Sequence, residues 1–276
     1  MKIGTRAHKE LFCRSLIATH RAYDPEAIEW PDLPTETLER LRSLPFWGEA
    51  LGTEQETGRK ITEYASAVRD PLLREAIAVQ GAEEVRHARI LEAMLRHYQI
   101  PVTPRVALAL PDDLEEAFVD AGYGECVDSF FAFGLFAFAR GAGIFPPVLL
   151  DRVEPIVAEE ARHIVFFANW EAYEQVHRRR GLKAIRAARA LRYYLRAVRR
   201  RLGAFRNTGG SGFTVSGARS MALDVTPESF LEICLRENGR RLVAFDPDLL
   251  RPRLVPALAR TTLRGLRLRP RRAPLA

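Results

Sequence analysis

Cysteine is scarce in this chain, which has only three in 276 residues. Cys13, Cys126 and Cys234 lie far apart, and no two of them form a Cys-x-x-Cys pair. Because a disulfide framework or a thiolate metal site needs closely spaced cysteines, this pattern excludes both. Low cysteine use is typical of the reducing cytosol, so we predict a cytoplasmic location.

Long hydrophobic runs are also missing. The first 20 residues lack the apolar core of a signal peptide. The most apolar segment, residues 130–138, is followed by Arg140, Gly141 and Pro146 before about 20 apolar residues accumulate. The sequence therefore predicts no transmembrane helix. It also lacks a nucleotide-binding fingerprint, since we interpret residues 207–213, NTGGSGF, as a flexible loop.

Acidic residues are absent from two stretches of a chain whose net charge is +7. None occurs between Glu174 and Asp224 or after Asp248, and arginines crowd both stretches. Clustered positive charge favours a polyanionic partner. We therefore expect the basic C-terminal third to contact nucleic acid or an anionic membrane, the latter as a peripheral membrane attachment.

Hydrophobic periodicity predicts an all-α fold with four long helices at residues 47–70, 71–98, 114–142 and 147–177. The Asp70–Pro71 step separates the first two, and the glycines and prolines of residues 141–147 separate the last two. Two tight hairpins joined by the long connection 99–113 match a four-helix bundle with one crossover.

Further parts surround this bundle, which we assign to residues 46–178. Residues 1–45 contain a short N-terminal helix and a proline-dotted arm that we expect to be irregular and outside the core. Residues 179–206 form a basic amphipathic helix, whose apolar stripe from Leu182 to Leu202 is expected to dock on the rest of the protein. Residues 207–276 combine the Gly-rich loop, short helices from Thr226 onward, and an Arg-rich tail that wraps around the protein or frays.

Two six-residue segments are nearly identical: residues 82–87 read AEEVRH and residues 158–163 read AEEARH. Residues three apart on a helix share a face, so Glu84 and His87 can bind one ion together, as can Glu160 and His163. Both pairs fall on the apolar faces of their helices. Because burying such groups without a partner is unfavourable, and a cation removes the penalty, the repeat predicts a metal site.

A two-metal site in a helical bundle also needs one carboxylate from each of the other two helices. In the first helix Glu54 lies on the apolar stripe and is our choice, with Glu56 as the alternative. In the third helix we prefer Glu125 to Asp128 because its side chain reaches further. Asp128 can instead orient a ligand histidine through the second ring nitrogen.

Residues near the repeats have two interpretations each. Glu83 and Glu159 either support the site together with Arg86 and Arg162 or form ion pairs on the surface. The phenylalanines of residues 130–138 either line a dry cavity beside the metals or fill the core. Four other histidines are expected at the surface or at helix ends, namely His8, His20, His97 and His177.

Taken in order, these carboxylates and the doubled Glu-x-x-His resemble the ferritin-like di-iron carboxylate superfamily, which includes demethoxyubiquinone hydroxylase, rubrerythrins and related di-iron oxygenases. The resemblance covers residues 47–177 and implies a ferritin-like bundle holding two iron ions, or manganese or a mixed Fe/Mn pair in their place. Glu84 and Glu160 would bridge or chelate the metals, and each histidine would bind one of them. The implied ligands are Glu54, Glu84, His87, Glu125, Glu160 and His163.

The resemblance also implies an activity, that of an O2-dependent oxygenase or hydroxylase acting on a small apolar organic molecule. Its electrons would come from a separate reductase or ferredoxin, and a homodimer is compatible with this function. One alternative is a tRNA-modifying hydroxylase that binds phosphates through the Arg-rich region. The other is an iron- or manganese-handling ferritin-like protein without oxygenase activity.

Overall fold

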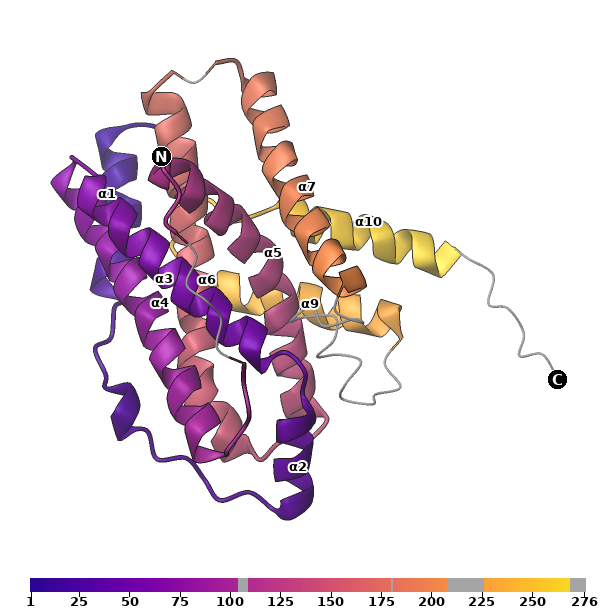
Figure 1. The fold of residues 1–276 in the computed structure, drawn as a ribbon. Helices are drawn as coiled ribbons and strands as arrows, with labels where there is room; N and C mark the ends of the chain where they lie inside the picture. The colour runs from indigo at the N-terminus through magenta and orange to yellow at the C-terminus, as the bar shows by residue number, and fades with distance from the viewer. Residues whose placement is uncertain (104–108, 180, 208–225, 269–276) are drawn as a thin grey trace.

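The computed structural model describes residues 1–103, 109–179, 181–207 and 226–268, with side chains described as far as Arg200 in the third range. Within these ranges every regular element is a helix, which confirms the all-α prediction (Figure 1). The elements are α1 (Arg6–Ala18), the 3-10 helix η1 (Pro25–Ala27), α2 (Thr35–Ser43), α3 (Trp47–Ala67), α4 (Pro71–His97), α5 (Leu114–Gly141), α6 (Pro147–His177), α7 (Lys183–Asn207), α9 (Pro227–Leu242) and α10 (Leu254–Leu268).

Local signals place the ends of the long helices. The Asp70 carboxylate accepts hydrogen bonds from the backbone N–H groups of Leu72 and Leu73, and Pro71 occupies the first helical position of α4. Asp113 caps α5 in the same way by accepting from the N–H of Glu116. Because caps and prolines act within one turn, the predicted bounds of α4 and α5 agree with the structure to within one residue.

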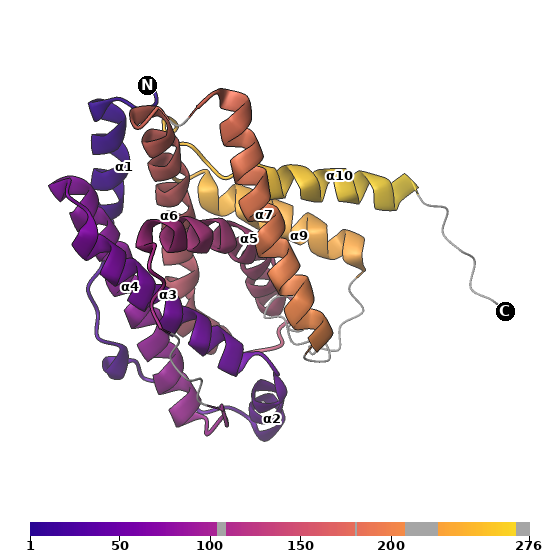
Figure 2. The same ribbon diagram turned by 45° about the horizontal axis from the view of Figure 1, so that its top comes forward.

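Helices α3, α4, α5 and α6 pack as a bundle-like core, in which α3 lies along α4 and α5, and α6 contacts α5 and α4 (Figures 1 and 2). Buried apolar side chains form one layer at the end where Phe118 packs edge-on against Trp170, with ring centroids 4.7 Å apart. A second layer, containing Met94 and Phe145, fills the other end. The repeated segments of α4 and α6 lie between the two layers, so the core holds their charged side chains inside.

The N-terminal helix forms as predicted, but the proline-dotted arm belongs to the core, contrary to our expectation for that arm. Helix α1 packs on α4 and α6, and Phe12 is fully buried against Phe166. The proline-dotted arm forms α2, and its Leu41 and Leu44 are buried in the second apolar layer. The open end of the bundle needs an apolar cover, and a pattern of scattered prolines does not reveal that need.

The C-terminal helices cover α5. The Thr226 hydroxyl caps α9 as predicted, by accepting from the N–H of Ser229. Residues 254–268 of the tail form α10 and pack against α9, so the tail does not fray there. The predicted loop at 208–213 and the last residues of the tail, 269–276, lie outside the described residues.

Helix α7 forms where predicted but docks through the opposite face. Tyr193 and Ala197 are the buried residues, whereas Leu182, Leu191 and Leu195 are 75%, 47% and 47% exposed. The expectation that the apolar stripe docks on the protein is therefore wrong for its described side chains. The docking face combines two tyrosines, Tyr193 and Tyr194, which pack against Tyr123, with arginines that pair with acidic side chains of α5.

Gly81 allows the backbones of α3 and α4 to come close together. A Cβ atom at this position would lie 3.0 Å from the backbone nitrogen of Thr62 and 2.8 Å from its hydroxyl oxygen. We expect Gly81→Ala to lower the free energy of unfolding by about 1 to 3 kcal/mol, because the helices must separate. Gly239→Ala in α9 is the matched control, since its Cβ meets nothing within 4 Å, and it should stabilise by about 0.5 to 1 kcal/mol. Urea unfolding of the metal-free protein measures both values, and equal effects would contradict the close-approach argument.

Candidate metal centre

The side chains of the six predicted ligands meet inside the bundle, between the two apolar layers. Two groups bring ligand-type atoms within 4.8 Å of one another, and Glu84 belongs to both. The first group contains Glu54, Glu84, His87 and Glu160, and the second contains Glu84, Glu125 and His163. The structure therefore places one carboxylate of α3, one of α5 and both Glu-x-x-His pairs in one cluster.

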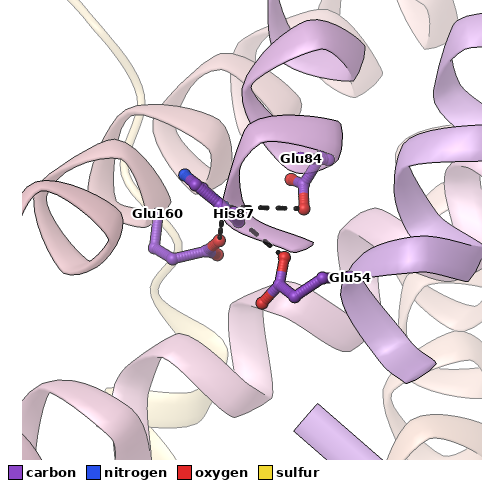
Figure 3. A group of neighbouring side chains, drawn as sticks. All are labelled: Glu54, Glu84, His87 and Glu160. Carbon is purple, nitrogen blue, oxygen red and sulfur yellow. Dashed lines mark ion pairs between the residues drawn. The ribbon is translucent and has the colours of Figure 1, made fainter. Parts of the chain in front are cut away.

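The shortest contacts in the cluster run between the two repeats rather than within each one. His163 Nδ1 lies 2.8 Å from Glu84 Oε1, and His87 Nδ1 lies 3.3 Å from Glu160 Oε1. Within one helix the corresponding distances are 3.9 Å for Glu84 with His87 and 3.8 Å for Glu160 with His163. Figure 3 shows the carboxylates of Glu54, Glu84 and Glu160 pointing toward His87. Glu84 and Glu160 thus lie between the two imidazoles, where a carboxylate can bridge two ions.

The structure also separates the alternative carboxylates. The carboxylate of Glu56 pairs with Lys60 one turn along α3, and Glu56 belongs to neither group of ligand-type atoms. Asp128 lines a neighbouring cavity and is likewise in neither group. Within the described residues, Glu54 and Glu125 are therefore the carboxylates that α3 and α5 bring to the cluster.

Two polar residues that the sequence analysis missed hold the cluster from outside. Gln80 donates from Nε2 to Glu125 Oε2 over 3.3 Å, and the Ser129 hydroxyl donates to Glu160 Oε2 over 3.3 Å. Gln80 precedes Glu84 by one helical turn, so its place on the same face was a usable signal. Ser129 follows Glu125 by one helical turn on α5, so the same signal was available for it.

The first glutamate of each repeat supports the histidine of the other repeat. Glu83 Oε2 lies 2.8 Å from His163 Nε2, and Glu159 Oε2 lies 2.8 Å from His87 Nε2. Arg162 donates to Glu83 over 2.9 Å, and Arg86 donates to Glu159 over 2.7 Å. Because Glu83 and Glu159 are buried, the interpretation as supports of the site describes them and the surface ion pair does not. The two repeats therefore brace each other across the bundle.

Two of the remaining histidines make long-range contacts that the sequence analysis did not predict. His20 lies just after α1, and its Nδ1 is 2.6 Å from Glu83 Oε1, so the N-terminal part reaches the support of the cluster. His8 is fully buried, and its Nε2 lies 3.0 Å from Asn169 Oδ1. Both contacts join segments more than 60 residues apart, which local sequence patterns do not encode. The ring of His177 stacks on Tyr173, and both His97 and His177 are exposed as predicted.

The charges of the cluster shift the ionisation of its members. Burial raises the pKa of Glu54 to about 8, with the charges of Glu84 and Glu160 adding to this effect. Burial and the same two charges raise the pKa of Glu125 well above its usual range. Burial also raises the pKa of Glu83, but hydrogen bonds and charges from His163 and Arg162 outweigh it and lower that pKa to about 2. The charge of Glu83 is thus balanced by its neighbours, whereas Glu54 and Glu125 lack enough positive charge beside them.

The donor atoms fit a pair of divalent cations. His87 Nδ1, His163 Nδ1, Glu84 Oε1 and Glu125 Oε1 are buried and have no hydrogen-bond partner. An ionised carboxylate can only accept hydrogen bonds, so Glu83 and Glu159 accept from the Nε2–H groups of the histidines. Each neutral imidazole then presents a lone pair at Nδ1. The four negative charges of the carboxylates in the two groups of ligand-type atoms would balance the four positive charges of two divalent cations. In the metal-free protein the surrounding carboxylates raise the pKa of both histidines despite burial. A metal that binds Nδ1 must therefore displace the proton that this atom carries in the charged imidazole.

A cavity of about 620 Å³ opens beside the cluster. Its wall includes the four inner glutamates and, beyond them, mostly apolar side chains of the second layer. Phe133 and Phe136 line it, whereas Phe130 packs elsewhere in the core, so the two interpretations of the Phe-rich helix apply to different residues. The apolar part of the wall includes Leu41, Leu91, Met94, Phe133, Phe136, Ala139, Phe145 and Leu149.

Comparisons of the chain with protein-family models, with curated proteins and with solved structures find no match. Within the described residues, no helix combines the length and the apolar character that crossing a membrane requires.

Proposed function

We propose that this chain is a ferritin-like di-metal oxygenase or hydroxylase that uses O2 to oxidise a small apolar organic molecule. The observation that carries the proposal is the pair of Glu/His groups sharing Glu84 next to an apolar cavity. Oxygen-rich ligand sets with one imidazole per metal suit Fe(II), and Mn(II) or a mixed pair is the alternative. The cavity volume is within the range of about 300 to 1,000 Å³ of small-molecule sites.

The residues of the chain have separate parts in this function. Glu84 and Glu160 would hold both metals, Glu54 and Glu125 would each complete one coordination sphere, and the Nδ1 atoms of the histidines would bind one metal each. When bound, the two ions would supply the redox chemistry that protein side chains lack. Glu83 and Glu159 keep the protons on Nε2 and so keep the Nδ1 lone pairs directed inward.

The cavity wall would provide the binding site for the organic molecule. Apolar side chains such as Phe136 exclude water from the carboxylates and bind an apolar molecule next to them. The described residues contain no second redox cofactor site that we recognise, so we propose that a separate reductase or ferredoxin delivers the electrons. The apolar cavity also distinguishes this function from metal storage or handling, which needs no space for an organic ligand.

The test starts from iron-loaded, chemically reduced protein that is mixed with O2 while O2 uptake and near-ultraviolet and visible absorption are recorded. We expect uptake above the rate of free iron in buffer and an absorption band that depends on O2. Protein that holds two irons but takes up O2 no faster than free iron would contradict the oxygenase and favour the iron-handling alternative.

Ala139→Phe tests the cavity separately. Ala139 is buried and lines the apolar end, so a phenyl ring there should fill part of the space. We expect about tenfold weaker binding of a medium-chain alcohol such as octanol, measured by calorimetry, with the metal content unchanged. Ala257→Phe on the exposed face of α10 is the control and should bind octanol like the wild type. Equal affinity in both variants would contradict a substrate cavity at this position.

A further inference from the structure

We propose that α7 is a membrane-docking helix that binds the surface of an anionic lipid bilayer. The exposed side of α7 carries large apolar side chains: Ile185, Leu191, Leu195 and Val198 are between 39% and 59% exposed. Exposed apolar side chains that recur along one helix face mark an interaction site rather than ordinary surface. In Figures 1 and 2 this helix runs alongside α5 and close to α9 and α10.

The charges next to this stripe identify the partner. Arg192 follows Leu191 and Arg199 follows Val198, so both exposed guanidinium groups border the apolar side chains. No acidic residue occurs anywhere between Glu174 and Asp224. An apolar face bordered by basic residues is the pattern of a helix that lies in the interface of an anionic membrane. In a homodimer formed through the same face, the arginines of the two copies would face each other and repel.

Nucleic acid is a poorer partner for this helix, because its other face is already occupied. Arg196 lies 3.5 Å from Glu116 and 3.6 Å from Asp120, and Arg189 lies 3.6 Å from Glu116, so these cations are bound to α5. The two tyrosines are turned inward as well: Tyr193 stacks on Tyr123 with ring centroids 5.1 Å apart, and Tyr194 packs edge-on against the same ring. Base stacking and a continuous basic face are therefore both absent from the described part of α7.

The position of α7 gives the docking a consequence. Arg200, near its C-terminal end, lines the border of the large cavity together with Asp120. A membrane bound by α7 would thus lie next to a helix that contributes to the wall of that cavity. The docking itself does not depend on the metal centre.

The experiment is sedimentation of the full-length chain with vesicles of phosphatidylcholine alone and with roughly one third phosphatidylglycerol. We expect the wild type to pellet only with the anionic vesicles. Leu191→Asp should weaken this binding by about tenfold or more, because it places a charge in the apolar stripe. Val148→Asp is the matched control, since Val148 is a similarly exposed apolar residue (44%) at the start of α6 and should leave binding unchanged.

Charge is tested with Arg192→Gln combined with Arg199→Gln, which should also weaken binding about tenfold or more, against the control pair Arg21→Gln and Arg69→Gln at other exposed sites. Each of three outcomes overturns the proposal. One is anionic-vesicle binding that Leu191→Asp does not change, which would be charge attraction alone. The second is no pelleting together with a dimer in solution that Leu191→Asp separates, which would assign the face to a second copy. The third is tighter binding to tRNA than to vesicles at the same salt concentration.

Discussion

Glu84→Ala is expected to abolish metal binding at both sites of the chain, whereas Glu54→Ala should abolish it at one. The wild type, purified from iron-supplemented cells or reconstituted with Fe(II), should hold about two ions per chain. Glu84 contributes to both groups of ligand-type atoms and Glu54 to only one, so the two substitutions should leave close to none and about one ion, respectively. Elemental analysis of the dialysed protein gives these ratios, and circular dichroism shows whether the helices remain.

Glu56→Ala is the control for this comparison. Glu56 is two residues from Glu54 on α3, but its carboxylate pairs with Lys60. This variant should keep about two ions, which would also decide between the two carboxylates that the sequence analysis considered. If instead Glu84→Ala retains both ions, the cluster is a buried network of protonated carboxylates and imidazoles. That result would contradict the proposed function.

Glu83→Gln and Glu159→Gln are expected to weaken metal binding by about 10- to 100-fold each, although neither residue contacts the metal. The amide oxygen still accepts the proton of the histidine Nε2–H, but its negative charge is lost, which leaves Arg162 or Arg86 unneutralised next to the cations. The effect should be specific to one site. Glu83→Gln should weaken the site that contains His163, and Glu159→Gln the site that contains His87.

A two-site metal titration followed by calorimetry measures this difference. Glu63→Gln is the matched control, because Glu63 is an exposed glutamate of α3, and it should bind both ions like the wild type. Because each glutamate acts on the histidine of the other helix, the two variants should weaken different sites. Weakening of both sites to the same extent by either variant would contradict it.

The sequence by itself determined the helices of the bundle and the two Glu-x-x-His pairs that meet in it, and it favoured Glu54 and Glu125 over Glu56 and Asp128. Helix ends follow from interactions within one turn, such as the Asp70 cap and Pro71, so local sequence predicts them. The doubled Glu-x-x-His places a carboxylate and an imidazole on one face of each of two helices, and the apolar flanks turn that face inward. These signals are contained in short segments, which is why the bounds of α4, α5 and α6 and the cluster residues could be predicted.

Only the tertiary structure decided which residues touch across helices. The pairing of Glu83 with His163 and of His20 with Glu83 depends on how three helical segments are positioned, and no spacing within one segment specifies it. The same holds for α7: its periodicity shows that one face is apolar, but only the folded chain decides that the face with Tyr193 and the arginines docks on α5 and the leucine face stays exposed. Hydrophobic patterning records which side chains prefer to leave water, whereas the partner that covers them is a property of the folded chain.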